Sequence, residues 1–230
     1  DPTLSDVRVR KALTMALDRE ELVEKVTKGG QIPSGGYVPS MTGYEAITGN
    51  TFDLAKAQAL LAEAGYPNGE GFPKMTIIYN TNEGHKKIAE YVQQAWKKNL
   101  GIDVELANLE WATFLDERQS GNFQIGRAGW VGDYQDPSNF LELFLADSGN
   151  NDGNYNNPEF DALMAKAASM PAGEERFEVL RQAEEMLVTE DQAIIPFYFY
   201  VTQNMIDLEK WDGWYTNTQD IHPYVGIKRK

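Results

Sequence analysis

The 230-residue sequence predicts an α/β fold, in which helices flank a β-sheet. Strand-like segments alternate with segments whose apolar residues recur every three or four positions, which is the pattern of a layered α/β structure. Apolar residues make up 42% of the chain and aromatic residues 11%, which is enough to build a core.

The N-terminal part of the chain is expected to form two helices separated by irregular chain. The run 6–26 has apolar residues at helical spacing, with Ser5 as its cap and a glycine pair after it. Residues 31–50 are rich in Gly, Pro, Ser and Thr and are expected to be irregular. A second helix is expected from Asp53, ending at Gly65 in a left-handed cap.

Strands and helices are expected to alternate in the middle of the chain. The strand-like segments are 74–79, 101–106 and 123–130, and the helical ones are 85–99 and 111–118. The second strand alternates apolar and charged residues, which is typical of a strand with one solvated face.

The remaining chain is expected to be mainly helical. A turn at 132–137 leads to a short helix, and a loop at 148–158 leads to helices at 159–169 and 174–190. The segment after residue 193 is the most β-prone in the chain, and its Pro196 favours an edge strand or a strand boundary.

Composition excludes several classes of function. The chain has 21 Lys and Arg against 35 Asp and Glu, a formal charge of −14, which disfavours nucleic acid and anionic membrane surfaces as partners. No apolar run approaches the roughly 20 residues of a membrane span, so no membrane insertion is expected. The absence of cysteine excludes disulfides, thiolate metal sites and cysteine nucleophiles.

No cofactor or metal site is expected. The two histidines, His85 and His222, lack metal-ligand spacing, and no nucleotide-binding glycine motif or serine nucleophile elbow is present. A glycosidase-like catalytic pair of Asp133 and Asp136 is an alternative that the sequence alone does not exclude. Residues 148–159 partly match a calcium-binding loop, but an Asn- and Gly-rich surface loop explains them better.

A polar and aromatic cluster surrounds the third predicted strand. Arg127 lies within that strand, so it requires either a structural carboxylate partner or a ligand. Gly129 allows the close approach of another backbone, and Trp130 follows it. Asp133 is expected where the strand ends, either as a ligand-binding carboxylate or as a capping residue of the turn.

This cluster resembles a segment of a known family. The sequence from Arg127 to Pro137, RAGWVGDYQDP, closely resembles the corresponding segment of oligopeptide-binding proteins, the extracytoplasmic receptors (solute-binding protein family 5) of peptide-importing ABC transporters. Further matches occur in family order at 6–13, 16–20, 60–66, 96–102, 114–118 and 155–161.

The resemblance implies a fold and a domain organisation. The fold would be a periplasmic-binding-protein-like type II lobe, with a mixed sheet flanked by helices. Residues 1–192 would form the C-terminal ligand-binding lobe, and residues 193–230 a strand and tail that return to a first lobe. Family members are longer, so the chain is expected to be their C-terminal portion.

The resemblance also implies roles for particular residues. Asp133 would bind the α-ammonium group of a peptide, and the backbone near Val131 would bond to the peptide main chain. The other expected peptide-binding residues would supply cations for the C-terminal carboxylate, aromatic pocket walls and an amide contact: Arg127, Arg118, His85, Trp130, Trp111 and Asn80. Val131 and Gly132 replace the small residues expected there, which affects pocket shape.

The expected function is therefore the binding of short peptides by lobe closure, without catalysis. The receptor would be a monomer, periplasmic or extracellular, with a possible lipid anchor on a preceding segment, and would serve the permease subunits of an ABC importer. A same-fold lobe for another solute, such as a nickel complex, haem or an oligosaccharide, is the alternative. A hydrolase is disfavoured, because the sequence offers no nucleophile.

Overall fold

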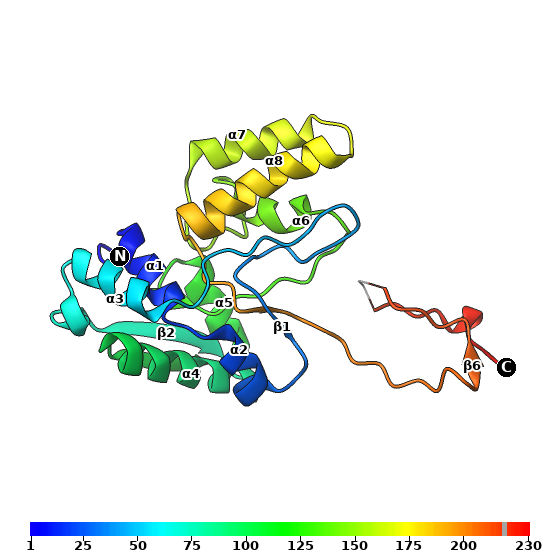
Figure 1. Cartoon of the computed structure of the whole chain (residues 1–230), viewed down its shortest axis with the longest axis horizontal. Coiled ribbons are helices and arrows are strands. Elements are labelled where there is room, and N and C mark those ends of the chain that lie inside the picture. Colours follow the sequence, from blue (N-terminus) through cyan, green and yellow to red (C-terminus); the bar gives the residue numbers. More distant parts are fainter. Residues whose placement is uncertain (218–219) are drawn as a thin grey trace.

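The computed structural model describes residues 1–217 and 220–230. Figure 1 shows two packed regions and a C-terminal part that extends away from both. We call them the sheet region (residues 1–33 and 53–127), the helical region (residues 37–47 and 138–190) and the C-terminal segment (residues 201–230).

The sheet region is built on a parallel sheet of three strands in the order β3-β2-β4. The strands are β2 (Met75–Asn80), β3 (Val104–Leu109) and β4 (Ile125–Gly126). All three are parallel, so this sheet is not the mixed sheet that was expected. The strand expected at 123–130 is also too long, because the N–H of Arg127 makes the last bond to β2, at 3.0 Å from the oxygen of Ile78, and the backbone then leaves the sheet.

Helices cover this sheet and form the first core. They are α1 (Val7–Met15), α2 (Arg19–Glu21), the π-helical η1 (Leu22–Thr27), α3 (Leu54–Glu63), the 3₁₀ turn η2 (Pro67–Gly69), α4 (Glu83–Leu100) and α5 (Trp111–Gln119). The indole N–H of Trp96 donates to the oxygen of Leu13 at 2.9 Å, which ties α4 to α1. The helices expected at 53–65, 85–99 and 111–118 are confirmed, and Gly65 has the left-handed φ of 99° predicted for it.

The prediction of a single helix at 6–26 is wrong, because the helix ends after α1 and a new helix begins at α2. Asp18 has an extended conformation and accepts a hydrogen bond from the N–H of Glu21 at 2.9 Å, so it caps a new helix. Asp6, rather than Ser5, caps α1 by accepting from the N–H of Arg8 at 2.8 Å. Caps satisfy N–H groups that a helix leaves unpaired, and aspartate accepts well there.

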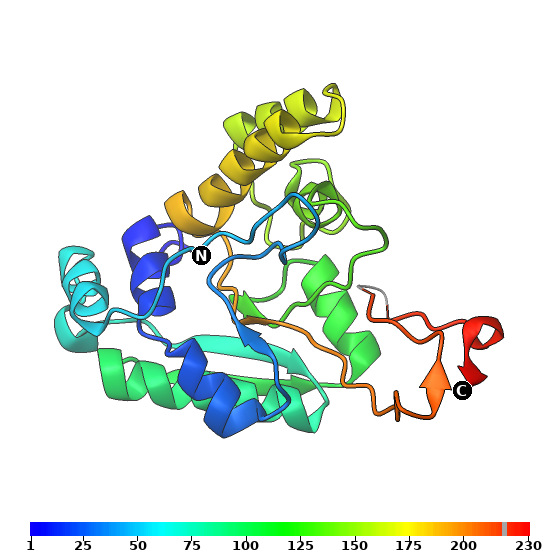
Figure 2. The same cartoon turned by 45° about the vertical axis from the view of Figure 1, so that its right-hand side comes forward.

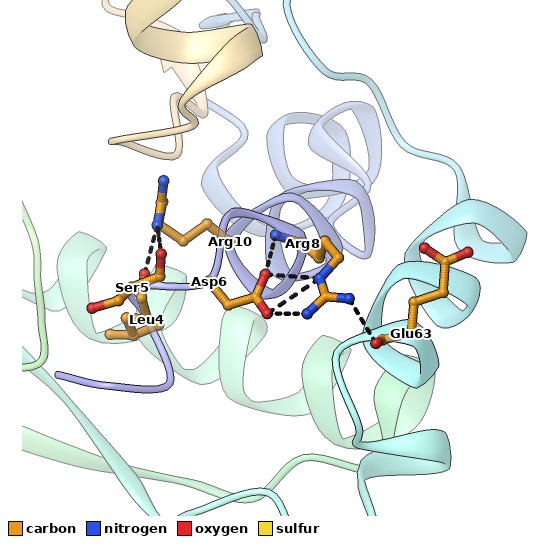
Figure 3. Close-up of polar contacts among 6 residues, drawn as sticks. All are labelled: Leu4, Ser5, Asp6, Arg8, Arg10 and Glu63. Atoms are coloured by element: carbon orange, nitrogen blue, oxygen red, sulfur yellow. Dashed lines mark hydrogen bonds and ion pairs between the residues drawn. The ribbon is translucent and has the colours of Figure 1, made fainter. Parts of the chain in front are cut away.

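The start of α1 is held by arginines on two sides (Figure 3). Arg8 pairs with Asp6 and donates to the backbone oxygen of Glu63 in α3, at 2.8 Å. Arg10 donates to the backbone oxygens of Leu4 and Ser5, at 2.7 and 3.0 Å. These contacts fix α1 against its neighbours.

The helical region has its own core. Its elements are α6 (Ser138–Leu141), the 3₁₀ turn η3 (Glu142–Phe144), α7 (Pro158–Ala168), α8 (Glu174–Glu185) and the π-helical η4 (Met186–Glu190). Helices α7 and α8 lie side by side at the top of Figure 1, and α6 lies beneath them. Apolar residues from the irregular segment 37–47 complete the core, among them Val38 and Tyr44. The helices expected at 159–169 and 174–190 are confirmed.

The chain then returns to the sheet region before it extends outwards (Figure 2). Strand β5 (Tyr198–Phe199) pairs with β1 (Ile32–Pro33) in an antiparallel ribbon, so the strand expected at 193–201 is much shorter than predicted. The C-terminal segment holds β6 (Trp211–Asp212), the 3₁₀ turn η5 (Tyr224–Gly226) and β7 (Lys228–Arg229). Among residues 1–217 and 220–230, no helix has both the length and the apolar character needed to cross a bilayer.

Candidate functional site

The candidate site lies at the edge of the sheet where the parallel strands end, which we call the carboxyl edge. In a parallel sheet these ends meet at one edge, and open α/β sheets place ligands there. Strand β2 ends at Asn80 and leads to His85 in α4, and β3 leads to Trp111 at the start of α5. Arg127 follows β4, so four of the predicted site residues come from segments that leave this one edge.

Asn80 and His85 are close to each other and to Arg127. In the described part of the chain, the buried Oδ1 of Asn80 and the buried Nδ1 of His85 have no hydrogen-bond partner. Burial lowers the pKa of His85, and the charge of Arg127 lowers it further, against a smaller opposite effect of the Asn80 backbone. A ligand that supplies a donor and an acceptor here would satisfy both groups.

Arg127 is just outside the strand, not within it as expected. Its Nη2 donates to the hydroxyl of Tyr200 at 2.7 Å. Gly129 lies against this pair, since a Cβ there would be 3.1 Å from the Nη2 of Arg127 and 3.3 Å from the hydroxyl of Tyr200. Tyr200 was not predicted as a site residue. It is 73 residues away from Arg127, and its only sequence signal is the run of aromatic residues in which it lies.

The backbone from Ala128 to Gly132 is unpaired. No hydrogen bond within the described chain involves its N–H or C=O groups. Most of this segment is exposed, and Val131 is 78% exposed. A backbone that leaves a sheet edge with free donors and acceptors can pair with an added strand.

A buried asparagine orients the end of this segment. The Oδ1 of Asn139 in α6 accepts from the indole N–H of Trp130 and from the N–H of Asp133, both at 3.0 Å. Gly132 leaves room for this contact, because a Cβ there would be 3.2 Å from the same oxygen and 3.0 Å from the ring of Phe140. Asn139 could not be predicted from the sequence, because its role depends on the position of α6.

Asp133 and Asp136 do not share the environment that a catalytic pair requires. Asp136 accepts from two nitrogens of Arg176 at 2.7 and 2.9 Å, and from the N–H of Ser138 at 3.0 Å. Burial raises the pKa of Asp136, but the bonds from Arg176 and Ser138 outweigh it and leave the pKa below its usual value. Asp136 is therefore a structural carboxylate that joins the turn to α8.

The structure separates the two predicted site residues of α5. Trp111 starts the helix at the carboxyl edge, and half of it is exposed. Arg118 lies seven residues later, about 10 Å along the helix axis, and forms an ion pair with Asp152. Asp152 belongs to the loop that partly matched a calcium site, and the described residues contain no cluster of three or more possible metal ligands.

Comparison with known proteins shows the family to which the chain belongs. A family model described as "Bacterial extracellular solute-binding proteins, family 5 Middle" matches residues 1–152. The periplasmic oligopeptide-binding protein of Salmonella typhimurium is 41% identical over 224 residues, which is 94% of this chain and 40% of that protein. The oligopeptide-binding protein of Bacillus subtilis is 43% identical over 206 residues, 86% of this chain and 38% of that one.

Solved structures give the same result. The Haemophilus influenzae oligopeptide-binding protein in complex with the peptide RPPGFSPFR matches with a TM-score of 0.79 and 34% identity, over 97% of this chain and 45% of that one. Similar proteins also include a probable deoxycholate-binding protein and a haem-binding protein. The chain spans about two fifths of the length of the curated relatives it matches. It belongs to family 5 of the bacterial extracellular solute-binding proteins.

Proposed function

We propose that this chain is the C-terminal lobe of a receptor that binds short peptides for an ABC importer. One observation carries the proposal: the unpaired backbone of residues 128–132 lies between a cation, Arg127, and a carboxylate, Asp133. A peptide in zwitterionic form has a free main chain between an ammonium and a carboxylate group. The two patterns are complementary.

The peptide would bind as an added strand. Its main chain would pair with the backbone of residues 128–132, which is independent of peptide sequence. Its ammonium group would bind Asp133 and its carboxylate would lie towards Arg127 and His85, because charge-assisted hydrogen bonds are the stronger ones. Trp111, Trp130 and Val131 would line side-chain pockets, and Asn80 would contribute an amide contact.

The domain organisation is part of the proposal. Residues 1–192 would form a periplasmic-binding-protein-like type II lobe, and residues 193–230 would return to a first lobe. The apolar exposure of the C-terminal segment supports this, because Met205 and Val225 are fully exposed and Tyr224 nearly so. Apolar side chains that gather on one exposed segment are typical of a surface that packs against a partner. Peptide binding would stabilise the closed arrangement of the two lobes, a shift of an existing equilibrium without chemistry.

Location and partners follow from the same proposal. The Salmonella relative is named as periplasmic. A receptor on the outer side of the cytoplasmic membrane would deliver its peptide to permease subunits of the importer.

Titration calorimetry on the two-lobe receptor tests this function. Trialanine with free ends is expected to bind, and N-acetyl-trialanine at least about thirtyfold more weakly, because its blocked end cannot pair with Asp133. A matched panel of a nickel complex, haem, deoxycholate and an oligosaccharide tests the alternative solutes. Equal affinity for free and acetylated peptide, or binding confined to the panel, would contradict the proposal.

A further inference from the structure

The two arginines expected at the ligand site, Arg118 and Arg127, have different partners. The Nη2 of Arg118 forms an ion pair with a carboxylate oxygen of Asp152, and only 20% and 14% of these two side chains are exposed. The guanidinium also lies over the ring of Phe114, 5.5 Å from its centre. Arg127 instead contacts the hydroxyl of Tyr200, which is a neutral group.

Asp152 is held in place by its own loop. The side chain of the neighbouring Asn151 donates to the backbone oxygens of Leu145 and Tyr155, at 3.1 and 2.8 Å. It also accepts from the N–H of Tyr155 at 2.9 Å. These bonds close the loop around Asn151, so the Asp152 carboxylate does not need ordering before it can pair with Arg118.

The pairing changes what Arg118 offers to a ligand. A guanidinium and a carboxylate in contact have no net charge, and partial burial strengthens their mutual attraction over that in water. A ligand carboxylate that approached Arg118 would have to displace Asp152 or accept its repulsion. No such cost applies at Arg127, whose hydroxyl partner carries no charge.

We propose that Asp152 neutralises Arg118, so that Arg127 is the group that binds a peptide carboxylate and Asp152 determines which arginine does so. This inference rests on the proposed peptide-binding function. It assigns Asp152 a role in specificity, although it lies 34 residues from Arg118 and outside the cluster found in the sequence.

The first experiment tests the pair without any peptide. Urea denaturation of the 230-residue chain as wild type, Arg118→Met, Asp152→Asn and the double variant forms a double-mutant cycle. We expect the two sites to be coupled by about threefold or more in the unfolding equilibrium constant. The matched control is the exposed pair Lys74 and Glu105, 3.6 Å apart, for which almost no coupling is expected. Equal coupling in the two cycles would overturn the neutralised pair.

The second experiment measures peptide affinity in the two-lobe receptor. Arg127→Met is expected to weaken trialanine binding by about thirtyfold or more, and Arg118→Met by less than about threefold. Asp152→Asn is expected to strengthen the binding of trialanine, but not of its C-terminal amide, because it releases the charge of Arg118. Losses of equal size in the two arginine variants would overturn the proposal.

The two experiments distinguish a failure of this inference from a failure of the proposed peptide-binding function. If the wild-type receptor bound no peptide, the proposed function would be wrong and with it the role of Arg127. Coupling in the first double-mutant cycle would still show that Asp152 pairs with Arg118.

Discussion

Glu184 in the helical region differs from Asn80 and His85 at the carboxyl edge in how its buried polar atoms are paired. In the helical region the fully buried carboxylate of Glu184 accepts from the hydroxyl of Tyr44 at 2.5 Å and from the N–H groups of Tyr37 and Val38, both at 2.8 Å. At the carboxyl edge the buried atoms of Asn80 and His85 have no partner in the described chain. Glu184 thus has its partners within the fold, whereas Asn80 and His85 each keep one buried atom without a partner in the described chain, as does the Oγ1 of Thr189 in the helical region.

We interpret this difference as one between a group that stabilises the fold and groups that we propose to contact a ligand. Buried polar groups are nearly always hydrogen-bonded in native proteins, so an unpaired one requires an explanation. The unpaired backbone of residues 128–132 directly follows Arg127, one of the four predicted site residues at the carboxyl edge. We therefore expect substitutions at this edge to change ligand binding, and substitutions in the helical region to change stability.

The largest effect is expected at the edge. Asp133→Ala in the two-lobe receptor should weaken trialanine binding by about 2–5 kcal/mol, because the peptide ammonium group loses its carboxylate. Calorimetry measures the affinity. Asp147→Ala, a change at an exposed aspartate, is the control and should leave binding unchanged. A similar loss in both variants would mean that net charge, rather than the site, determines affinity.

The next largest effect is expected in the helical region. Glu184→Ala should lower the free energy of unfolding of the chain by about 2–4 kcal/mol, because it leaves three buried donors without an acceptor. Glu184→Gln keeps an acceptor oxygen and should cost less than half as much. Denaturation in urea measures both, and an alanine variant as stable as wild type would break the comparison between the regions.

Two asparagines provide a smaller and more direct test. Asn139→Leu removes the acceptor for Trp130 and Asp133 and should cost about 1–2 kcal/mol of stability. Asn80→Leu removes an oxygen that has no partner and should stay within about 0.5 kcal/mol of wild type. Urea denaturation of the two leucine variants compares them at equal side-chain size, and equal costs would show that Asn80 is structurally bonded after all.

The smallest effect is a pH dependence of stability. Burial raises the pKa of Glu184 above 4.5, although its three hydrogen bonds oppose the shift. The folded-state pKa is therefore higher than the unfolded-state pKa, so protonation of Glu184 stabilises the folded state. This contribution to the free energy of unfolding is fully present below about pH 4.5 and is lost as pH rises through the folded-state pKa. From pH 4 to pH 7, the free energy of unfolding of wild type should therefore fall relative to that of Glu184→Gln. Parallel stability curves for the two proteins would contradict this.

Local sequence signals accounted for most of the secondary structure. Asp53 and Gly65 mark the two ends of α3, because capping depends only on nearby residues. The periodicity of α8 and the turn that precedes α6 are local in the same sense. The segment from Arg127 to Asp133 was also found from the sequence, since its residue types follow one another directly.

Only the tertiary structure decided which of these groups meet. Three contacts join residues that are apart in the sequence: Arg118 with Asp152, Arg127 with Tyr200, and Asn139 with Trp130. Each contact depends on how separate elements pack. The short β4 has the same origin, because the backbone leaves β2 after the bond from the N–H of Arg127 to the oxygen of Ile78. Sequence patterns report the conformational preferences of neighbouring residues, whereas contacts between distant residues depend on the packing of the whole core. The sequence alone thus identified the family-like segment and its charges, and the fold determined that Arg118 and Asp136 are paired with charged groups whereas Arg127 contacts a neutral hydroxyl.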